Sequence, residues 1–193
     1  QTCALPIYFE FRFKAPKGQG FWIALWLMGI EDTWPGGEID IVEHDGSFPT
    51  RFSHALHHAN PATGADVATG SFPTIPYERE VDEWNVVSGE WNPDGTIQFR
   101  VNHSPTWLAS HTMHRPMYVL MNLALAPTPE AVPGFWIVGP DASTPSPGRF
   151  AIDYVRCWQR PSHKANLPAI SSPPMMSRTG NVLTITPGVS NAA

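Results

Sequence analysis

The sequence predicts an all-β domain, built as a sandwich of short antiparallel strands. Apolar residues recur at every second position or in short continuous runs, and no stretch shows a helical period. Turn residues separate these runs, with 21 prolines and 15 glycines among 193 residues. Short strands divided by frequent turns are typical of sandwich folds, and a chain of this length suits one domain plus a tail.

The first strand shows the clearest pattern, because Ile7, Phe9, Phe11 and Phe13 alternate with polar residues, as in a half-buried strand. Strands are expected, in chain order, at 7–14, 21–28, 38–44, 52–58, 84–91, 96–102, 117–125 and 149–158. Residues 59–80 contain frequent proline and glycine and are expected to form a loop. The Asn-Pro-Asp-Gly sequence at 92–95 predicts a hairpin turn.

The strand at 21–28 is apolar on both faces, which is typical of a strand inside a sandwich. We therefore expect Trp22 and Trp26 to lie in the core, together with Trp91 of a later strand.

Composition excludes several classes of partner. The net charge is −5, only 15% of residues are charged, and no basic patch stands out, so a nucleic-acid partner is not expected. No apolar run of 18 residues predicts a membrane span. The two cysteines, Cys3 and Cys157, give neither a disulfide framework nor a metal-binding spacing.

Three carboxylates stand within the six residues from Glu38 to Glu43. Because side chains alternate along a strand, Glu38 and Asp40 share one face, whereas Glu43 has the opposite parity. A β-bulge at Ile41–Val42 would place two residues opposite one and return Glu43 to the face of Glu38. The two glutamates would then have Cα atoms roughly 13 Å apart and could lean together until their carboxyls are about 5–5.5 Å apart.

Such a carboxylate pair suits the retaining cleavage of a glycosidic bond. The alternatives are a solvated acidic face or a calcium loop. A calcium loop needs a flexible backbone rich in glycine and asparagine, and this segment is stiff and β-branched.

The Glu-x-Asp-x-x-Glu motif and its surroundings resemble glycoside hydrolase family 16, in the form shared by laminarinases, agarases and carrageenases. The resemblance extends in collinear order over about residues 8–159. It includes the stretches 8–20, 21–29, 90–97, 117–125 and 152–156. It implies a jelly-roll β-sandwich of the concanavalin A-like type, with a sugar cleft on the concave face.

The resemblance also implies a role for each carboxylate. Glu38 matches the family nucleophile, Glu43 the acid/base and Asp40 the assisting carboxylate between them. The neighbouring negative charge is expected to keep Glu43 protonated. No cofactor is required.

Further cleft residues are expected from the same resemblance. Trp34 matches a sugar-facing aromatic residue, Asn122 matches a cleft asparagine, and Trp136 is a looser aromatic candidate. Either His57 or His58 matches a histidine that lines the cleft, depending on the register of its strand. A core position for Trp34 is the alternative.

The sequence contains two candidate metal sites. Asp153 matches a residue that helps to bind a structural calcium ion in many family members. His54 and His58 share a face of one predicted strand, but a metal site needs a third ligand and supporting contacts, so this pair does not favour metal binding.

Departures from the family pattern lie at Ile23, at Trp84-Asn85 and over 127–136, in or near expected cleft loops. They concern the choice of substrate more than the class of reaction.

The ends of the chain fit the family poorly. Residues 1–7 are expected to be a non-native leader, and the resemblance begins several strands inside the family's domain, which implies a fold incomplete at its N-terminus. Residues 160–193 are expected to be a Pro-rich linker and tail, with the possible start of another module near 181–186.

The sequence thus predicts a secreted, monomeric, endo-acting, retaining β-glycanase that hydrolyses β-1,3-glucan. Two alternatives stay open. One is an agarase or carrageenase of the same family, and the other is a lectin-like carbohydrate-binding module without catalysis.

Overall fold

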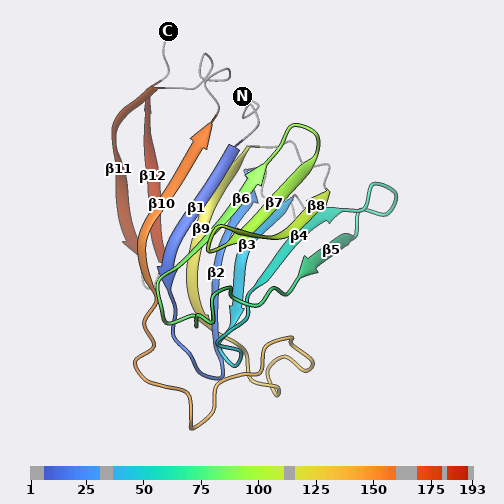
Figure 1. Cartoon of the computed structure of the whole chain (residues 1–193), viewed down its shortest axis with the longest axis vertical. Helices are drawn as coiled ribbons and strands as arrows, with labels where there is room; N and C mark the ends of the chain where they lie inside the picture. Colours follow the sequence, from blue (N-terminus) through green and yellow to red (C-terminus); the bar gives the residue numbers. More distant parts are fainter. Residues whose placement is uncertain (1–6, 31–36, 111–115, 160–168, 180–181, 191–193) are drawn as a thin grey trace.

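Two five-stranded antiparallel sheets form the body of the molecule (Figure 1). The computed structural model describes residues 7–30, 37–110, 116–159, 169–179 and 182–190. The strands are β1 (Ile7–Lys14), β2 (Phe21–Gly29), β3 (Glu38–Asp45), β4 (Ser53–Ala59), β5 (Asp66–Ser71), β6 (Asn85–Trp91), β7 (Thr96–Val101), β8 (Ser104–Ser110), β9 (Met117–Leu125), β10 (Ala151–Gln159), β11 (Ala169–Thr179) and β12 (Val182–Ser190).

The chain crosses repeatedly between the two sheets. One sheet has the strand order β10-β1-β6-β7-β8, and the other has the order β5-β4-β3-β2-β9. Every pairing within them is antiparallel. This is the jelly-roll sandwich that the sequence predicts, and no helix occurs among the described residues. None of those residues forms a helix able to span a membrane.

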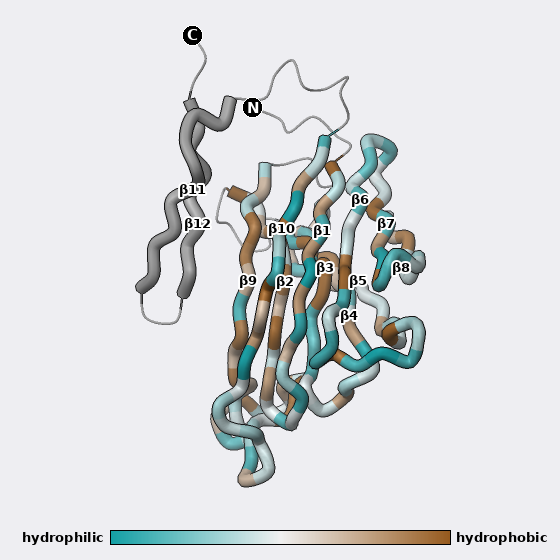
Figure 2. Tube along the Cα trace, turned by 60° about the vertical axis from the view of Figure 1, so that its left-hand side comes forward, coloured by the Kyte–Doolittle hydropathy of each residue, from teal (hydrophilic) through white to brown (hydrophobic). Residues whose placement is uncertain are grey.

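Alternating side chains explain why the two sheets stack. Hydrophobic and hydrophilic positions follow one another along the strands (Figure 2), so each sheet has one apolar face. The expected alternation in β1 is confirmed, because Ile7, Phe9, Phe11 and Phe13 are all buried. They join β2, β3, β6 and β7 residues in a single hydrophobic core.

Two strands of the five-stranded sheets were not predicted, and neither was β11 (Ala169–Thr179), which lies where a linker was expected. β5 lies within the expected loop at 59–80, and β8 follows β7 directly. β5 contains small polar residues and stands at a sheet edge, and β8 begins Ser-Pro, so neither carries the apolar alternation that marks a strand. Pairing with a neighbouring strand, rather than local preference, makes them strands.

β11 and β12 pair with each other as a separate two-stranded sheet. The division of the chain near residue 159 into a domain and a tail stays a prediction.

The two sheets approach closely where Ile41 of β3 lies over Gly89 of β6. A Cβ atom added to Gly89 would lie 2.6 Å from Cδ1 of Ile41. We expect Gly89→Ala to lower the free energy of unfolding by about 1–3 kcal/mol through overpacking. Ile41→Val removes the clashing methyl group at a cost of about 0.5–1.5 kcal/mol. The double variant should therefore lose less than the sum of the two single losses in urea unfolding.

Ile39→Val is the matched control, since Ile39 is equally buried on the same strand. Its effect should add to that of Gly89→Ala. Equal coupling with Ile39 and Ile41 would show that the contact with Ile41 does not set the spacing of the sheets.

Candidate active site

A β-bulge interrupts β3 at Ile41–Val42. Against β2, Val42 pairs with Leu25 and Asp40 pairs with Trp26, so Ile41 is the extra residue. Against β4, the register also shifts between Asp40 and Glu43, which leaves Ile41 and Val42 opposite a single residue. The bulge predicted from the parity of the carboxylates is confirmed.

The bulge sorts the side chains of β3 between two faces. Ile41 and Val42 are 1% and 0% exposed and both belong to the core. Directly paired positions share a face of a sheet. Glu38, Asp40 and Glu43 are paired with Met28, Trp26 and Ala24, which are alternate residues of β2. All three carboxylates therefore lie on one face, away from the core.

His54 fills the place opposite the bulge. Its Nδ1 lies 2.6 Å from the carbonyl oxygen of Ile41, and its Nε2 lies 2.9 Å from the hydroxyl of Thr106 on the other sheet. Because a carbonyl only accepts, Nδ1 carries the proton and donates it. Burial lowers the pKa of His54 to about 4, so the ring is neutral near neutral pH and its Nε2 accepts from Thr106.

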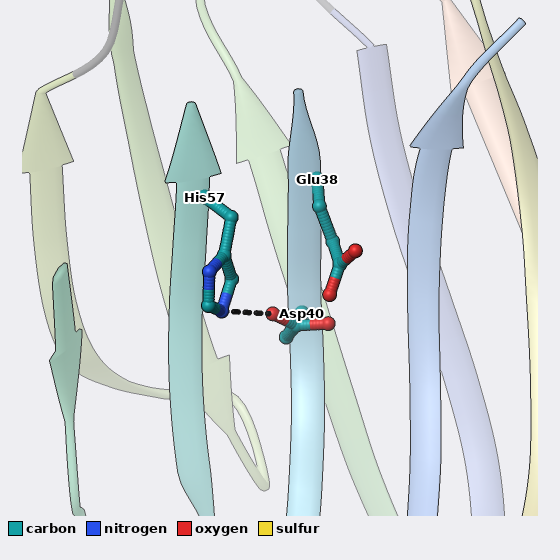
Figure 3. A group of neighbouring side chains, drawn as sticks. All are labelled: Glu38, Asp40 and His57. Carbon is teal, nitrogen blue, oxygen red and sulfur yellow. Dashed lines mark ion pairs between the residues drawn. The ribbon is translucent and has the colours of Figure 1, made fainter. Parts of the chain in front are cut away.

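Asp40 is the most buried carboxylate of the three, at 2% exposure. Burial, and then the charges of Glu43 and Glu38, raise the pKa of Asp40 well above its usual value. The carboxyl groups of Asp40 and Glu38 point toward each other (Figure 3). A hydrogen bond between them raises the pKa of Asp40 and lowers that of Glu38.

Burial is the main cause of the remaining shifts. It raises the pKa of Glu38, against the opposing charge of His57 and the bond from Asp40. It also raises the pKa of Glu43, while the indole of Trp22, whose Nε1 donates to Oε1 of Glu43 at 2.9 Å, lowers it. From the sequence, a neighbouring negative charge is the expected cause of the raised pKa of Glu43. The charge of Glu38 does raise the pKa of Glu43, but burial of the carboxyl raises it more.

The structure distinguishes the two candidate histidines. His57 pairs with Glu38 across the sheet and lies on the carboxylate face (Figure 3). Its Nε2 is 3.7 Å from Asp40 and its Nδ1 is 3.0 Å from Asp66. His58, one residue later, has the opposite parity and shares the face of Leu56 in the core. The cleft position predicted for His58 is therefore wrong.

Glu38, Asp40 and His57 form the one group of three potential metal ligands found among the described side chains, with ligand atoms within 4.8 Å of one another. His54 and His58 do not belong to such a group. Asp153 forms an ion pair with Arg12, and that cation opposes calcium binding at this carboxylate. The predicted calcium site stays a prediction without a described ligand set.

Trp22 and Trp26 were expected in the core, and this is wrong. They occupy alternate positions of β2 on the carboxylate face, and each is partly buried. Trp26 donates its indole N–H to Oδ1 of Asn122 at 2.8 Å. The parity of β2 was a usable signal, since both tryptophans alternate with the core residues Ile23, Leu25 and Leu27. Trp91 is in the core as expected.

Asn122 of β9 pairs with Ala24, which in turn pairs with Glu43, so it lies on the same face. Its position is as predicted, and its contact with sugar stays a prediction. Trp136 is 47% exposed, with its ring centroid 6.1 Å from that of Trp22 in an edge-to-face arrangement. Trp34 lies outside the described residues.

Comparison with known proteins identifies the family. The family described as Glycosyl hydrolases family 16 matches residues 7–156. Glucan endo-1,3-beta-glucosidase A1 of Niallia circulans is 29% identical in an alignment 170 residues long, which covers 78% of this chain and 24% of that protein.

Two solved structures are similar in fold and sequence. The laminarinase catalytic domain of Thermotoga maritima is 26% identical with a TM-score of 0.66, over 80% of this chain and 64% of that one. The endo-beta-1,3-glucanase of Pyrococcus furiosus is 29% identical with a TM-score of 0.65, over 81% of this chain and 62% of that one. This chain thus spans less than two thirds of each of these relatives. The chain belongs to glycosyl hydrolase family 16, as its carboxylate motif indicates.

Proposed function

We propose that this domain is an endo-acting, retaining β-glycanase that hydrolyses β-1,3-glucan. The observation that carries the proposal is the bulge in β3, which gathers Glu38, Asp40 and Glu43 on one face in a partly dehydrated setting. The family supports glycoside hydrolysis, and the two similar glucanase structures support glucan as the substrate.

The environment of each carboxyl suits one chemical role. Asp40 holds a proton because burial and two neighbouring acids oppose its ionisation, and it donates this proton in a hydrogen bond to Glu38. That bond and the electrostatic interaction with His57 both favour the ionised form of Glu38. Glu38 is then the nucleophile that attacks the anomeric carbon.

Glu43 is the proton donor. Its Oε1 accepts the indole N–H of Trp22, so the acidic proton sits on the other oxygen, where it can reach the glycosidic oxygen. Protonation of that oxygen accompanies departure of the leaving sugar and formation of the glycosyl ester on Glu38. Glu43 then takes a proton from a water molecule, which attacks the anomeric carbon and frees Glu38 with net retention.

Glu38→Gln and Glu43→Gln should each lower the hydrolysis of laminarin by at least about 100-fold, because each removes one chemical group. Azide should restore turnover of an activated aryl β-glucoside by Glu38→Ala, giving the α-glucosyl azide, since the small anion attacks from the vacated side. The measurements are release of reducing sugar and the configuration of the azide product.

Laminarin, lichenan, agarose and carrageenan form the substrate panel for the unaltered chain. Release of reducing ends from laminarin, with the β-anomer appearing first in the NMR spectrum, supports the proposal. Hydrolysis of agarose or carrageenan instead would support the related galactan hydrolases. Binding without any release of reducing sugar would support a lectin-like module.

The hydrogen bond from Trp22 predicts a specific change in the pH profile. This bond stabilises the charged form of Glu43 and lowers its pKa, so Trp22→Phe should raise that pKa. Because activity requires protonated Glu43, the alkaline limb of kcat/KM should move to higher pH while the acid limb stays in place. The pH profile on laminari-oligosaccharides checks this.

Trp26→Phe is the matched control, since its indole bonds to Asn122 and not to a carboxylate. The alkaline limb of the kcat/KM profile of Trp26→Phe should coincide with that of the unaltered protein. Equal shifts in the two variants, or a shift of Trp22→Phe to lower pH, would contradict the assignment of Glu43 as the acid.

A further inference from the structure

We propose that a cavity at the Asp45 end of β3 is a second binding subsite, which holds a neutral hexose unit of the substrate chain away from the cleavage point. The proposal rests on the function proposed above. The cavity has a volume of about 220 Å³, and its lining includes Asp45, Phe48, Arg51, Phe72 and Trp136.

The cavity continues the carboxylate face. Asp45 follows Glu43 by two residues on β3 and pairs with Trp22, so its side chain points the same way. Trp22 bonds to Glu43 on one side and packs against Trp136 on the other. Since Trp136 also lines the cavity, one aromatic wall connects the proposed acid/base with this pocket.

Three aromatic side chains of the lining are unusually exposed. Phe48, Phe72 and Trp136 are 45%, 62% and 47% exposed. Aromatic rings present a flat apolar surface, which suits the C–H face of a pyranose ring, and covering them would remove apolar area from water.

Arg51 supplies polar contacts between the aromatic rings. Its guanidinium carbon lies 4.0 Å from the ring centre of Phe48 and 5.5 Å from that of Phe72. No carboxylate among the described side chains forms an ion pair with Arg51. Stacking covers the flat faces of the guanidinium, whereas its N–H groups at the edge can donate to hydroxyl groups.

The charges of the pocket favour a neutral sugar over an anionic one. Asp45 and Arg51 both line the cavity, so their formal charges cancel. Asp45 also offers acceptor oxygens, one of which binds the backbone N–H of Ser47. A donor and an acceptor beside aromatic rings match the hydroxyls of a hexose, while a sulfate group would meet the carboxylate of Asp45.

The test compares Phe72→Ala and Arg51→Ala with the unaltered chain on β-1,3-gluco-oligosaccharides of three to seven units. The loss in kcat/KM should grow with chain length and reach about tenfold on the longest substrate, because only long chains reach the pocket. Tyr77→Ala is the control, since Tyr77 is 72% exposed and does not line the cavity. Equal losses at every length would overturn the proposal.

Binding separates this proposal from the proposed function. The Glu38→Gln protein is titrated with the same oligosaccharides and with a sulfated galactan oligosaccharide, using tryptophan fluorescence. Tighter binding of longer neutral chains, lost in Phe72→Ala, would support the subsite even if the unaltered chain hydrolysed no glucan. A length advantage that survives Phe72→Ala, a preference for the sulfated chain, or no binding of neutral chains would overturn it.

We also infer that His54 is a positioning residue, which holds the bulge of β3 in the shape that presents Glu43. A bulge leaves backbone groups outside the regular ladder, and the carbonyl of Ile41, one of the two bulge residues, accepts the Nδ1 proton of His54. Glu43 follows two residues later.

The imidazole is held firmly from the opposite sheet. It is 1% exposed, it stacks on Phe99 of β7 at 4.8 Å between ring centroids, and it accepts from Thr106 of β8. His54 does not reach the carboxylate face, because its parity in β4 places it in the core. It therefore acts only through the backbone of β3.

The side chains of Asn and Leu have nearly the same shape, but at position 54 only Asn can donate an N–H to the carbonyl of Ile41. His54→Leu should lower kcat by tenfold or more with KM within twofold. The alkaline limb of its kcat/KM profile should move to higher pH, because a displaced Glu43 loses the hydrogen bond from Trp22. His54→Asn should retain most of the kcat of the unaltered protein, and its alkaline limb should lie at the same pH as in that protein.

Thr106→Val is the control for a general loss of packing, since it removes the contact at Nε2 and leaves the bond to the bulge. It should lower the melting temperature without moving the alkaline limb. Equal losses of kcat in the Leu and Asn variants, or a limb that does not move in His54→Leu, would overturn the positioning role and leave His54 as a packing residue.

Discussion

The arrangement of this site depends on one extra residue in β3. A regular strand would place Glu43 on the face opposite Glu38 and Asp40, toward the core. The bulge at Ile41–Val42 changes the parity once, so that both aliphatic side chains enter the core and all three carboxylates share the other face. Burial of two aliphatic residues stabilises the bulge, so the packing energy of the core also fixes the geometry of the site.

The two sheets cooperate in holding this bulge. Ile41 extends over Gly89 of the opposite sheet, which has no side chain of its own to clash with it. His54 bonds to the bulge carbonyl and is bonded in turn by Thr106 from the opposite sheet. The second sheet contributes no carboxylate to the site, yet it limits the positions that β3 can adopt. Such support from a rigid scaffold is what a preorganised carboxylate group requires.

Burial also determines the proton distribution on the carboxylate face. The tryptophans of β2 and the neighbouring strands exclude water from carboxyls that would ionise at low pH in solution, and the pKa values of Glu38, Asp40 and Glu43 all rise. Specific hydrogen bonds then separate the three groups. Asp40 stabilises the ionised form of Glu38, and the indole of Trp22 orients Glu43. The same tryptophans lead toward the cavity beside Asp45.

The sequence by itself determined the fold class, most strand positions, the carboxylate motif and the bulge, because each follows from local alternation of residue types along a strand. It did not predict β5 and β8, which are strands only because a neighbour pairs with them. It could not choose between His57 and His58, or join Phe48, Arg51 and Phe72 into one cavity. Those features depend on which residues of separate strands and loops become neighbours. Register and loop packing decide this through contacts distant in sequence, and only the tertiary structure contains them.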